Sequence, residues 1–143
     1  SDLQRVWYLR RSGERKAPRA LQHAFDAVRA ALEAGAAKLK PGVPGWVVDD
    51  AARSLIVAAG YPEFKHALGH QMGRAAHDGS TILGPRWERY GATPLGLVEE
   101  GNVFTLELGV QTEAGAVSLE EDVLVTSRGC ELISTPQTTM WYL

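Results

Sequence analysis

The sequence predicts an α+β fold in which two helices pack against an antiparallel sheet. Two neighbouring segments before residue 60 have the three-to-four-residue apolar spacing of helices, and the segments after it have the two-residue spacing of strands. A block of strands after the helices is typical of α+β proteins, because parallel sheets alternate strand and helix. With 143 residues, the chain is long enough for one domain with its own core.

The first elements are a strand followed by two helices. The strand is expected in "SDLQRVWYL", which is rich in aliphatic and aromatic residues. A first helix is predicted between Leu21 and Leu39, and "KPG" ends it. A second helix is predicted between Val47 and Ala59. It ends at Gly60, where a left-handed cap favours glycine, and Pro62 follows.

Three later segments are predicted to be strands: "HALGHQMG", "NVFTLELGV" and "AVSLEEDVLVTS". The "TEAG" between the last two is typical of a hairpin turn. Strand alternation places Glu107 opposite the apolar face formed by Phe104, Leu106, Leu108 and Val110. It also places Glu120 on one face with Ser118 and Asp122. Glu121 falls on the apolar side, where a carboxylate needs a partner.

Three of the four histidines lie between residues 66 and 77. His66 and His70 would share a face in either a helix or a strand, and the glycines at 69 and 73 favour the strand. Taken alone, a histidine or glutamate is more often an ordinary core or surface residue. Carboxylates and imidazole together suit manganese, cobalt or zinc, although periodicity does not show that they meet. His23, beside the apolar stripe of the first helix, is expected to have a packing or surface role.

Composition narrows the class of protein. The chain is 45% hydrophobic with a formal net charge of -2, so neither nucleic acid nor an anionic membrane is an expected partner. No apolar run approaches the length of a membrane span, and no signal peptide precedes the first strand. The single cysteine, Cys130, excludes an internal disulfide and a thiolate metal cluster. A cytoplasmic location is therefore expected.

The segments "HALGHQMGRAAHD", "GNVFTLELG" and "LEEDVLVTSRG" resemble three successive signatures of the pita-bread metallopeptidases, the family of methionine aminopeptidase, aminopeptidase P and prolidase. "SDLQR" resembles the strand that carries the family's second metal-binding aspartate. The resemblance implies a curved antiparallel sheet backed by two helices. It also implies two divalent metal ions (Mn, Co or Zn), whose ligands would be Asp2, His70, Glu107 and Glu120, with Glu120 favoured over Glu121.

The resemblance further implies a peptidase in which a metal-bridged hydroxide attacks the peptide bond. Glu107 would carry the proton, while His66 and His77 would hold the substrate and stabilise the transition state. The position of His66 and the "SD..R" pattern are similar to the proline-specific branch, which indicates Xaa-Pro bonds. Leu108, Ser118 and Gly79 to Ser80 depart from the family pattern around the pocket. The alternative is a non-catalytic module of this fold that binds peptides or proteins.

The resemblance also implies that residues 1–143 are the C-terminal portion of a catalytic domain. Family members carry a further metal-binding aspartate on a strand before Asp2, and their fold has two pseudo-symmetric halves. The expected partners are a peptide substrate and the missing N-terminal half. Exposed strand edges would otherwise favour pairing with a second copy in a homodimer.

Overall fold

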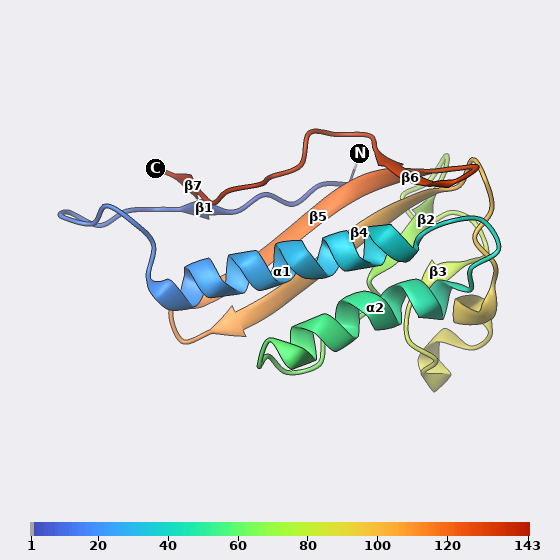
Figure 1. Ribbon diagram of the computed structural model, residues 1–143, viewed down its shortest axis with the longest axis horizontal. Helices are drawn as coiled ribbons and strands as arrows, with labels where there is room; N and C mark the ends of the chain where they lie inside the picture. The colour runs from blue at the N-terminus through green and yellow to red at the C-terminus, as the bar shows by residue number, and fades with distance from the viewer. Residues whose placement is uncertain (1) are drawn as a thin grey trace.

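The computed structural model describes residues 2–143 and has two layers, with two helices covering one face of a sheet (Figure 1). The helices are α1 (Arg19–Lys38) and α2 (Gly45–Ala58). The sheet has the order β3-β2-β4-β5-β6, and every neighbouring pair is antiparallel. Its strands are β2 (Gly69–Met72), β3 (Ile82–Leu83), β4 (Val103–Thr112), β5 (Gly115–Thr126) and β6 (Gly129–Leu132). The predicted α+β class is confirmed.

Both helices form where the apolar spacing predicts them. In α1 the apolar stripe is buried, and Phe25 and Val28 are fully excluded from solvent. Burying each such side chain contributes roughly 1.5–3 kcal/mol, so α1 is held chiefly by its contact with the sheet. At the end of α2, Gly60 has a φ of +90°, a backbone conformation that favours glycine. Between β3 and β4 the chain makes two short 3-10 helices, η1 (Glu88–Tyr90) and η2 (Thr93–Leu95).

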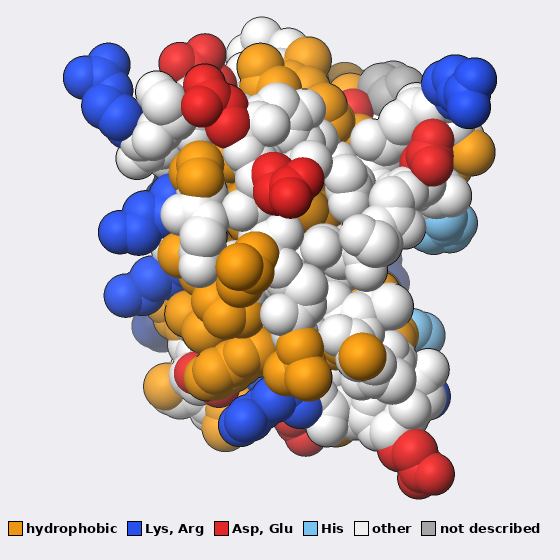
Figure 2. All heavy atoms as spheres, turned by 90° about the vertical axis from the view of Figure 1, so that its right-hand side faces the viewer, with side chains coloured by type: hydrophobic (Ala, Val, Ile, Leu, Met, Phe, Trp, Pro, Cys, Tyr) orange, Lys and Arg blue, Asp and Glu red, His pale blue; other side chains and the backbone are white. Residues whose placement is uncertain are grey.

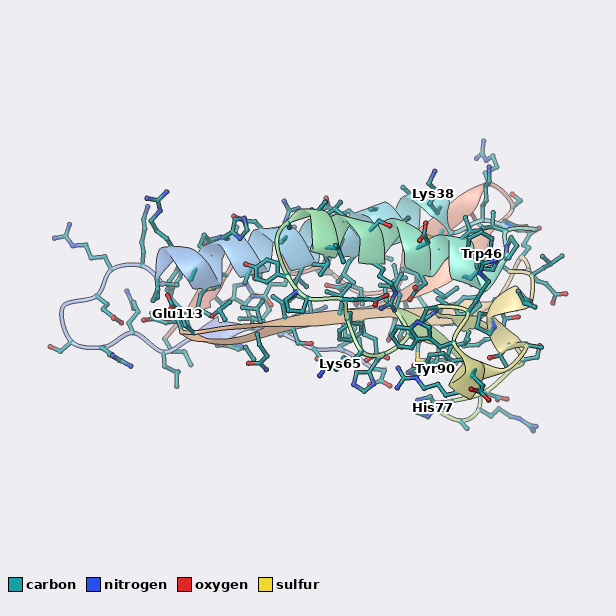
Figure 3. The ribbon with its side chains drawn as sticks, turned by 90° about the horizontal axis from the view of Figure 1, so that it is seen from below. Lys38, Trp46, Lys65, His77, Tyr90 and Glu113 are labelled. Carbon is teal, nitrogen blue, oxygen red and sulfur yellow. The ribbon has the colours of Figure 1, made fainter. Side chains whose placement is uncertain are left out.

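The hairpin of β4 and β5 is the centre of the sheet. Its two-residue loop, Glu113 to Ala114, lies within the predicted "TEAG" turn. Phe104, Leu106 and Leu108 are buried on the helix side, as alternation predicts. Neither α1 nor α2 lies on the opposite side of the sheet, as the edge-on view in Figure 3 shows. The hairpin therefore has one packed apolar face and one polar face.

The N-terminal segment differs from its prediction. It forms only a two-residue strand, β1 (Trp7–Tyr8), which pairs in parallel with β7 (Trp141–Tyr142), and an isolated bridge between Gln4 and Glu120. Side chains replace the strand ladder in between. The amide of Gln137 accepts from the backbone N–H of Val6 at 2.8 Å and donates to its carbonyl at 2.7 Å. The expected strand is thus only partly regular.

The molecular surface mixes charged and apolar groups. Figure 2 shows hydrophobic side chains gathered over part of the end of the molecule, with histidines reaching the surface at one edge of the view. Large apolar residues with more than a third of their surface exposed include Leu95, Leu97, Leu132 and Ile133. Within residues 2–143, neither helix has the length and apolar character of a membrane span.

Candidate metal centre

Four separate segments bring acidic and imidazole groups together on the face of the sheet opposite α1 and α2. Asp2, His70 and Glu120 each offer a ligand atom, and these three atoms lie within 4.8 Å of one another. His70 Nε2 is 3.7 Å from Asp2 Oδ2 and 3.8 Å from Glu107 Oε1. The structure therefore gathers all four of the predicted metal ligands, and we call them the acid cluster.

The strand register explains this convergence. Glu107 on β4 is directly opposite Glu120 on β5, so their side chains share a face. His70 comes from β2, the other neighbour of β4, and its backbone N–H donates to Thr105 Oγ1 at 3.0 Å. Asp2 lies along β5, on the other side of Glu120. The cluster thus depends on three adjacent strands and the N-terminal segment.

Thr105 and Asp122, for which no role was predicted, hold the backbone of two cluster residues. Thr105 and Asp122 face each other across β4 and β5, and both are buried. Thr105 receives the N–H of His70, while both carboxylate oxygens of Asp122 receive the N–H of Asp2, at 3.2 and 3.3 Å. Strand alternation had placed both residues on this face. The available signal for a supporting role was a polar side chain within an otherwise apolar strand.

The acid cluster concentrates negative charge. Burial is the main cause that raises the pKa of Glu107 above its ordinary value, and the neighbouring Asp2 adds to it. Burial also raises the pKa of Glu120, helped by the charges of Glu107 and Asp2, whereas the Gln4 hydrogen bond opposes the shift. Among residues 2–143, no lysine or arginine pairs with these carboxylates.

The cluster has the chemistry of a divalent cation site. Carboxylate oxygens with an imidazole nitrogen suit manganese, cobalt or zinc, and a cation would neutralise carboxylates that are partly desolvated and close to one another. His70 directs Nε2 at the carboxylates. Its Nδ1 is buried and has no hydrogen-bond partner among the described residues. The donor set therefore fits a metal, with Nε2 as the imidazole ligand.

His77 lies beside the cluster. Its exposed ring is 4.1 Å, centroid to centroid, from the ring of His70. Figure 3 shows it on the side of the sheet away from the helices. Its charge also lowers the pKa of Glu107, although burial outweighs this effect. His77 is thus close enough to act on a group bound at the cluster.

His66 occupies a different place from the one that strand spacing suggested. It lies in the bend before β2, so the expected strand face shared with His70 is wrong. There it lines a groove of about 580 Å³, whose other walls include Phe64, Gly109 and Ser118. Gly109 and Ser118 are paired two positions along the hairpin from Glu107 and Glu120. The groove therefore runs beside the acid cluster.

A buried ion pair on α2 explains the bend. Arg53 binds Asp49 through two hydrogen bonds of 2.7 and 2.8 Å. The same guanidinium donates to the carbonyls of Phe64 and His66, and Asp49 accepts the N–H of Leu68 at 3.0 Å. These bonds take the backbone partners that a longer β2 would need. This pair was not predicted from the sequence, where its signal is a pair of opposite charges four residues apart on a helix.

Glu121 has the partners that its position on the apolar side requires. Arg5 forms an ion pair with Oε2 at 2.8 Å, Ser134 donates to the same oxygen at 3.2 Å, and the backbone N–H of Gln137 donates to Oε1 at 3.3 Å. Both oxygens are therefore engaged within the protein. Glu120, and not Glu121, therefore belongs to the acid cluster.

A comparison with known families identifies the class of protein to which this fold and site belong. The chain matches the model of metallopeptidase family M24 over residues 1–127, and it belongs to that family. The resemblance inferred from the sequence motifs is confirmed.

Individual relatives support the same assignment. The chain is 36% identical over 115 residues to an uncharacterized peptidase of Staphylococcus saprophyticus, which covers 79% of this chain and 31% of that protein. An X-Pro aminopeptidase from Thermotoga maritima has a similar structure, with a TM-score of 0.77 and 29% identity over 90% of this chain and 34% of that one. A Xaa-Pro dipeptidase from Bacillus anthracis gives a TM-score of 0.76 with 26% identity, over 90% of this chain and 34% of that one. The chain thus spans about a third of the length of these relatives.

Proposed function

We propose that this chain carries part of the active site of a metal-dependent peptidase that cleaves Xaa-Pro bonds with two divalent cations. The observation that carries the proposal is the convergence of Asp2, Glu107, Glu120 and His70 beside a groove of about 580 Å³. The solved relatives with at least 25% identity include an X-Pro aminopeptidase and a Xaa-Pro dipeptidase, which supports the proline-specific branch.

In this proposal the four residues of the acid cluster hold the cations. Bound there, the ions would polarise the scissile carbonyl and make the attacking water more acidic. Glu107 accepts the proton of that water and passes it to the leaving amine.

The two flanking histidines would act on the substrate. His77, beside His70, donates a hydrogen bond to the oxygen on which negative charge develops. His66, in the wall of the groove, binds the substrate backbone next to the cleaved bond. The small side chains of Gly109 and Ser118 leave space in that wall. We propose that this groove receives the residues that flank the peptide bond.

We also propose that residues 1–143 are the C-terminal portion of a larger catalytic unit. Support comes from the relatives, of which this chain covers about a third. The uncovered polar face of the sheet would then face the remaining part of the unit, which would add further ligands to the second cation.

The test uses the intact protein as its host makes it. Metal content is measured after dialysis against Mn²⁺, Co²⁺ or Zn²⁺, and hydrolysis is followed with Ala-Pro, with a longer Ala-Pro peptide and with matched peptides containing alanine in place of proline. Metal-dependent cleavage confined to the proline peptides is expected. A protein that binds no metal and cleaves none of these peptides contradicts the proposal.

Variants assign the roles. His70→Ala and Glu120→Ala are expected to abolish metal binding, because each removes a ligand. His77→Ala is expected to retain the metal and to lower kcat about 100-fold, the usual cost of losing a donor to the developing charge. If His77→Ala lost the metal, or kept full activity, the role given to His77 would be wrong.

A further inference from the structure

Glu120 is held by a short chain of polar side chains outside the acid cluster. Gln4 Nε2 donates to Glu120 Oε2 at 2.7 Å, and Ser118 Oγ donates to Gln4 Oε1 at 2.6 Å. The orientation of the Gln4 amide follows from the chemistry, because an ionised carboxylate can only accept and therefore requires the NH₂ end. Gln4 thus has a partner for each end of its amide.

The backbone places these three residues side by side. Gln4 and Glu120 form a bridge, with reciprocal N–H to carbonyl bonds of 3.3 Å, so their side chains share a face. Ser118 is two residues before Glu120 on β5 and projects from the same face. Strand β5 thus sets the positions of Ser118 and Glu120, and the bridge to Glu120 sets that of Gln4.

Gly109 leaves space for the Ser118 side chain. Gly109 is directly opposite Ser118 on β4, and a Cβ atom there would lie 3.0 Å from Ser118 Oγ and 3.1 Å from Ser118 Cβ. That spacing is tighter than ordinary packing. A side chain at 109 would require Ser118 to shift by a few tenths of an ångström, so the glycine leaves room for Ser118 where it contacts Gln4.

We propose that Gln4 and Ser118 position the carboxylate of Glu120 for metal binding. This inference rests on the proposed function of the acid cluster as a divalent cation site. By binding Oε2, Gln4 restricts rotation of the carboxylate, which has an oxygen within 4.8 Å of the ligand atoms of Asp2 and His70. Removing a group that orients a metal ligand in this way commonly lowers metal affinity about 10- to 100-fold.

Glu121, the next residue on β5, offers a matched comparison. Its hydrogen bond from Ser134, at 3.2 Å, resembles the contact that Gln4 makes with Glu120. Glu121 does not belong to the acid cluster, since its oxygens bind Arg5, Ser134 and Gln137. Removing the Ser134 hydroxyl should therefore affect folding stability and leave metal affinity unchanged.

The experiment measures Mn²⁺ affinity by calorimetry, and the free energy of unfolding in urea without metal, for the intact protein and four variants. The variants are Gln4→Met, Ser118→Ala, the double variant and the control Ser134→Ala. Methionine keeps the length of Gln4 without its hydrogen bonds. Gln4→Met is expected to weaken Mn²⁺ binding by about 10- to 100-fold. Ser118→Ala should have a smaller effect in the same direction, because the amide remains but is free to turn.

The double variant tests whether the two residues act as one chain. Its affinity should equal that of Gln4→Met, since Ser118 acts only through Gln4. Ser134→Ala should bind Mn²⁺ like the wild type.

Unchanged affinity in both Gln4→Met and Ser118→Ala, with wild-type binding intact, overturns this inference alone. Equal weakening in Ser134→Ala also overturns it, because the effect would then be a general loss of stability. Wild-type protein that binds none of Mn²⁺, Co²⁺ and Zn²⁺ and cleaves no peptide refutes the proposed function itself; if it binds only Co²⁺ or Zn²⁺, the same comparison of variants is made with that ion. If Gln4→Met does not fold, Ser118→Ala decides the question.

Discussion

The carboxylates of α2 and those of the acid cluster are built into the molecule in opposite ways. On α2, Asp49 is neutralised by Arg53, and every polar atom of the pair has a partner in the protein. On the sheet, Glu107 and Glu120 face each other and Asp2, and no lysine or arginine among residues 2–143 compensates them. The first group ties a helix to the bend at residues 64–68. The second is left with unused binding capacity.

This difference separates a stabilising site from a binding site. A buried charge that is fully paired has nothing left to offer a ligand, whereas a cluster of like charges costs stability and gains from a cation. Proteins commonly accept such local costs where they bind or react. The acid cluster is therefore the functional candidate, although the ion pair is the more deeply buried of the two groups.

The largest effect is expected from breaking the ion pair. Arg53→Met leaves Asp49 buried without a counter-charge, and the free energy of unfolding should fall by about 3–5 kcal/mol. Adding Asp49→Leu removes the orphaned charge, so most of the loss should be recovered. Urea denaturation measures both variants. A double variant as unstable as Arg53→Met would mean that the backbone bonds to residues 64–68, and not the charge, dominate.

Changes in the acid cluster are expected to have a smaller effect on the free energy of unfolding. Here, unlike at the ion pair, the charges themselves lower the stability of the metal-free protein. The pKa values of Glu107 and Glu120 are raised on folding, so the folded, metal-free protein binds protons more tightly than the unfolded chain. The contribution of these groups to stability therefore increases as pH falls from neutrality towards the ordinary carboxyl range near about 4.3. The variant Glu107→Gln with Glu120→Gln should lose this pH dependence.

Metal should reverse that dependence. Protons and Mn²⁺ compete for the same carboxylates, so acidification weakens binding and removes the stability that bound metal supplies. Unfolding midpoints at pH 7 and at about pH 5, measured with EDTA and with Mn²⁺, provide the comparison. The same slope with and without Mn²⁺ would show that the cluster does not bind the ion.

The smallest effect is expected at His23, which belongs to neither group. Its Nδ1 forms an exposed hydrogen bond of 2.8 Å with the hydroxyl of Tyr61. His23→Ala should therefore cost no more than about 0.5–1.5 kcal/mol and leave Mn²⁺ affinity unchanged. Loss of metal binding in a folded His23→Ala protein would contradict the assignment of the site.

Sequence periodicity predicted the parts of this molecule in which one face is packed. The two helices and the faces of β4 and β5 follow directly from their apolar spacing. The motif resemblance singled out Asp2, His70, Glu107 and Glu120, which the structure brings together. Periodicity alone could not do so, because the meeting of Asp2 with Glu120 depends on contacts across more than a hundred residues of sequence.

What escaped prediction depends on side chains that replace backbone hydrogen bonds. Arg53 and Asp49 shorten β2 and move His66 into the groove wall, and Gln137 interrupts the regular pairing of the first strand. When a side chain takes the place of a backbone partner, the segment that it binds shows no periodic signal of the change. Local spacing describes a strand well only where its partners are other strands.

The pairing of β1 with β7 has a consequence for how the molecule folds. Trp7 and Trp141 are register partners, so this pairing joins residues that lie far apart in the sequence. Contacts of such high sequence separation carry a large loop-closure entropy and generally form late. Asp2 and Gln4 lie on this segment, whereas His70, Glu107 and Glu120 lie on strands that pair through shorter connections. We therefore expect the acid cluster to be completed near the end of folding, so that metal capture in refolding experiments follows formation of the hairpin.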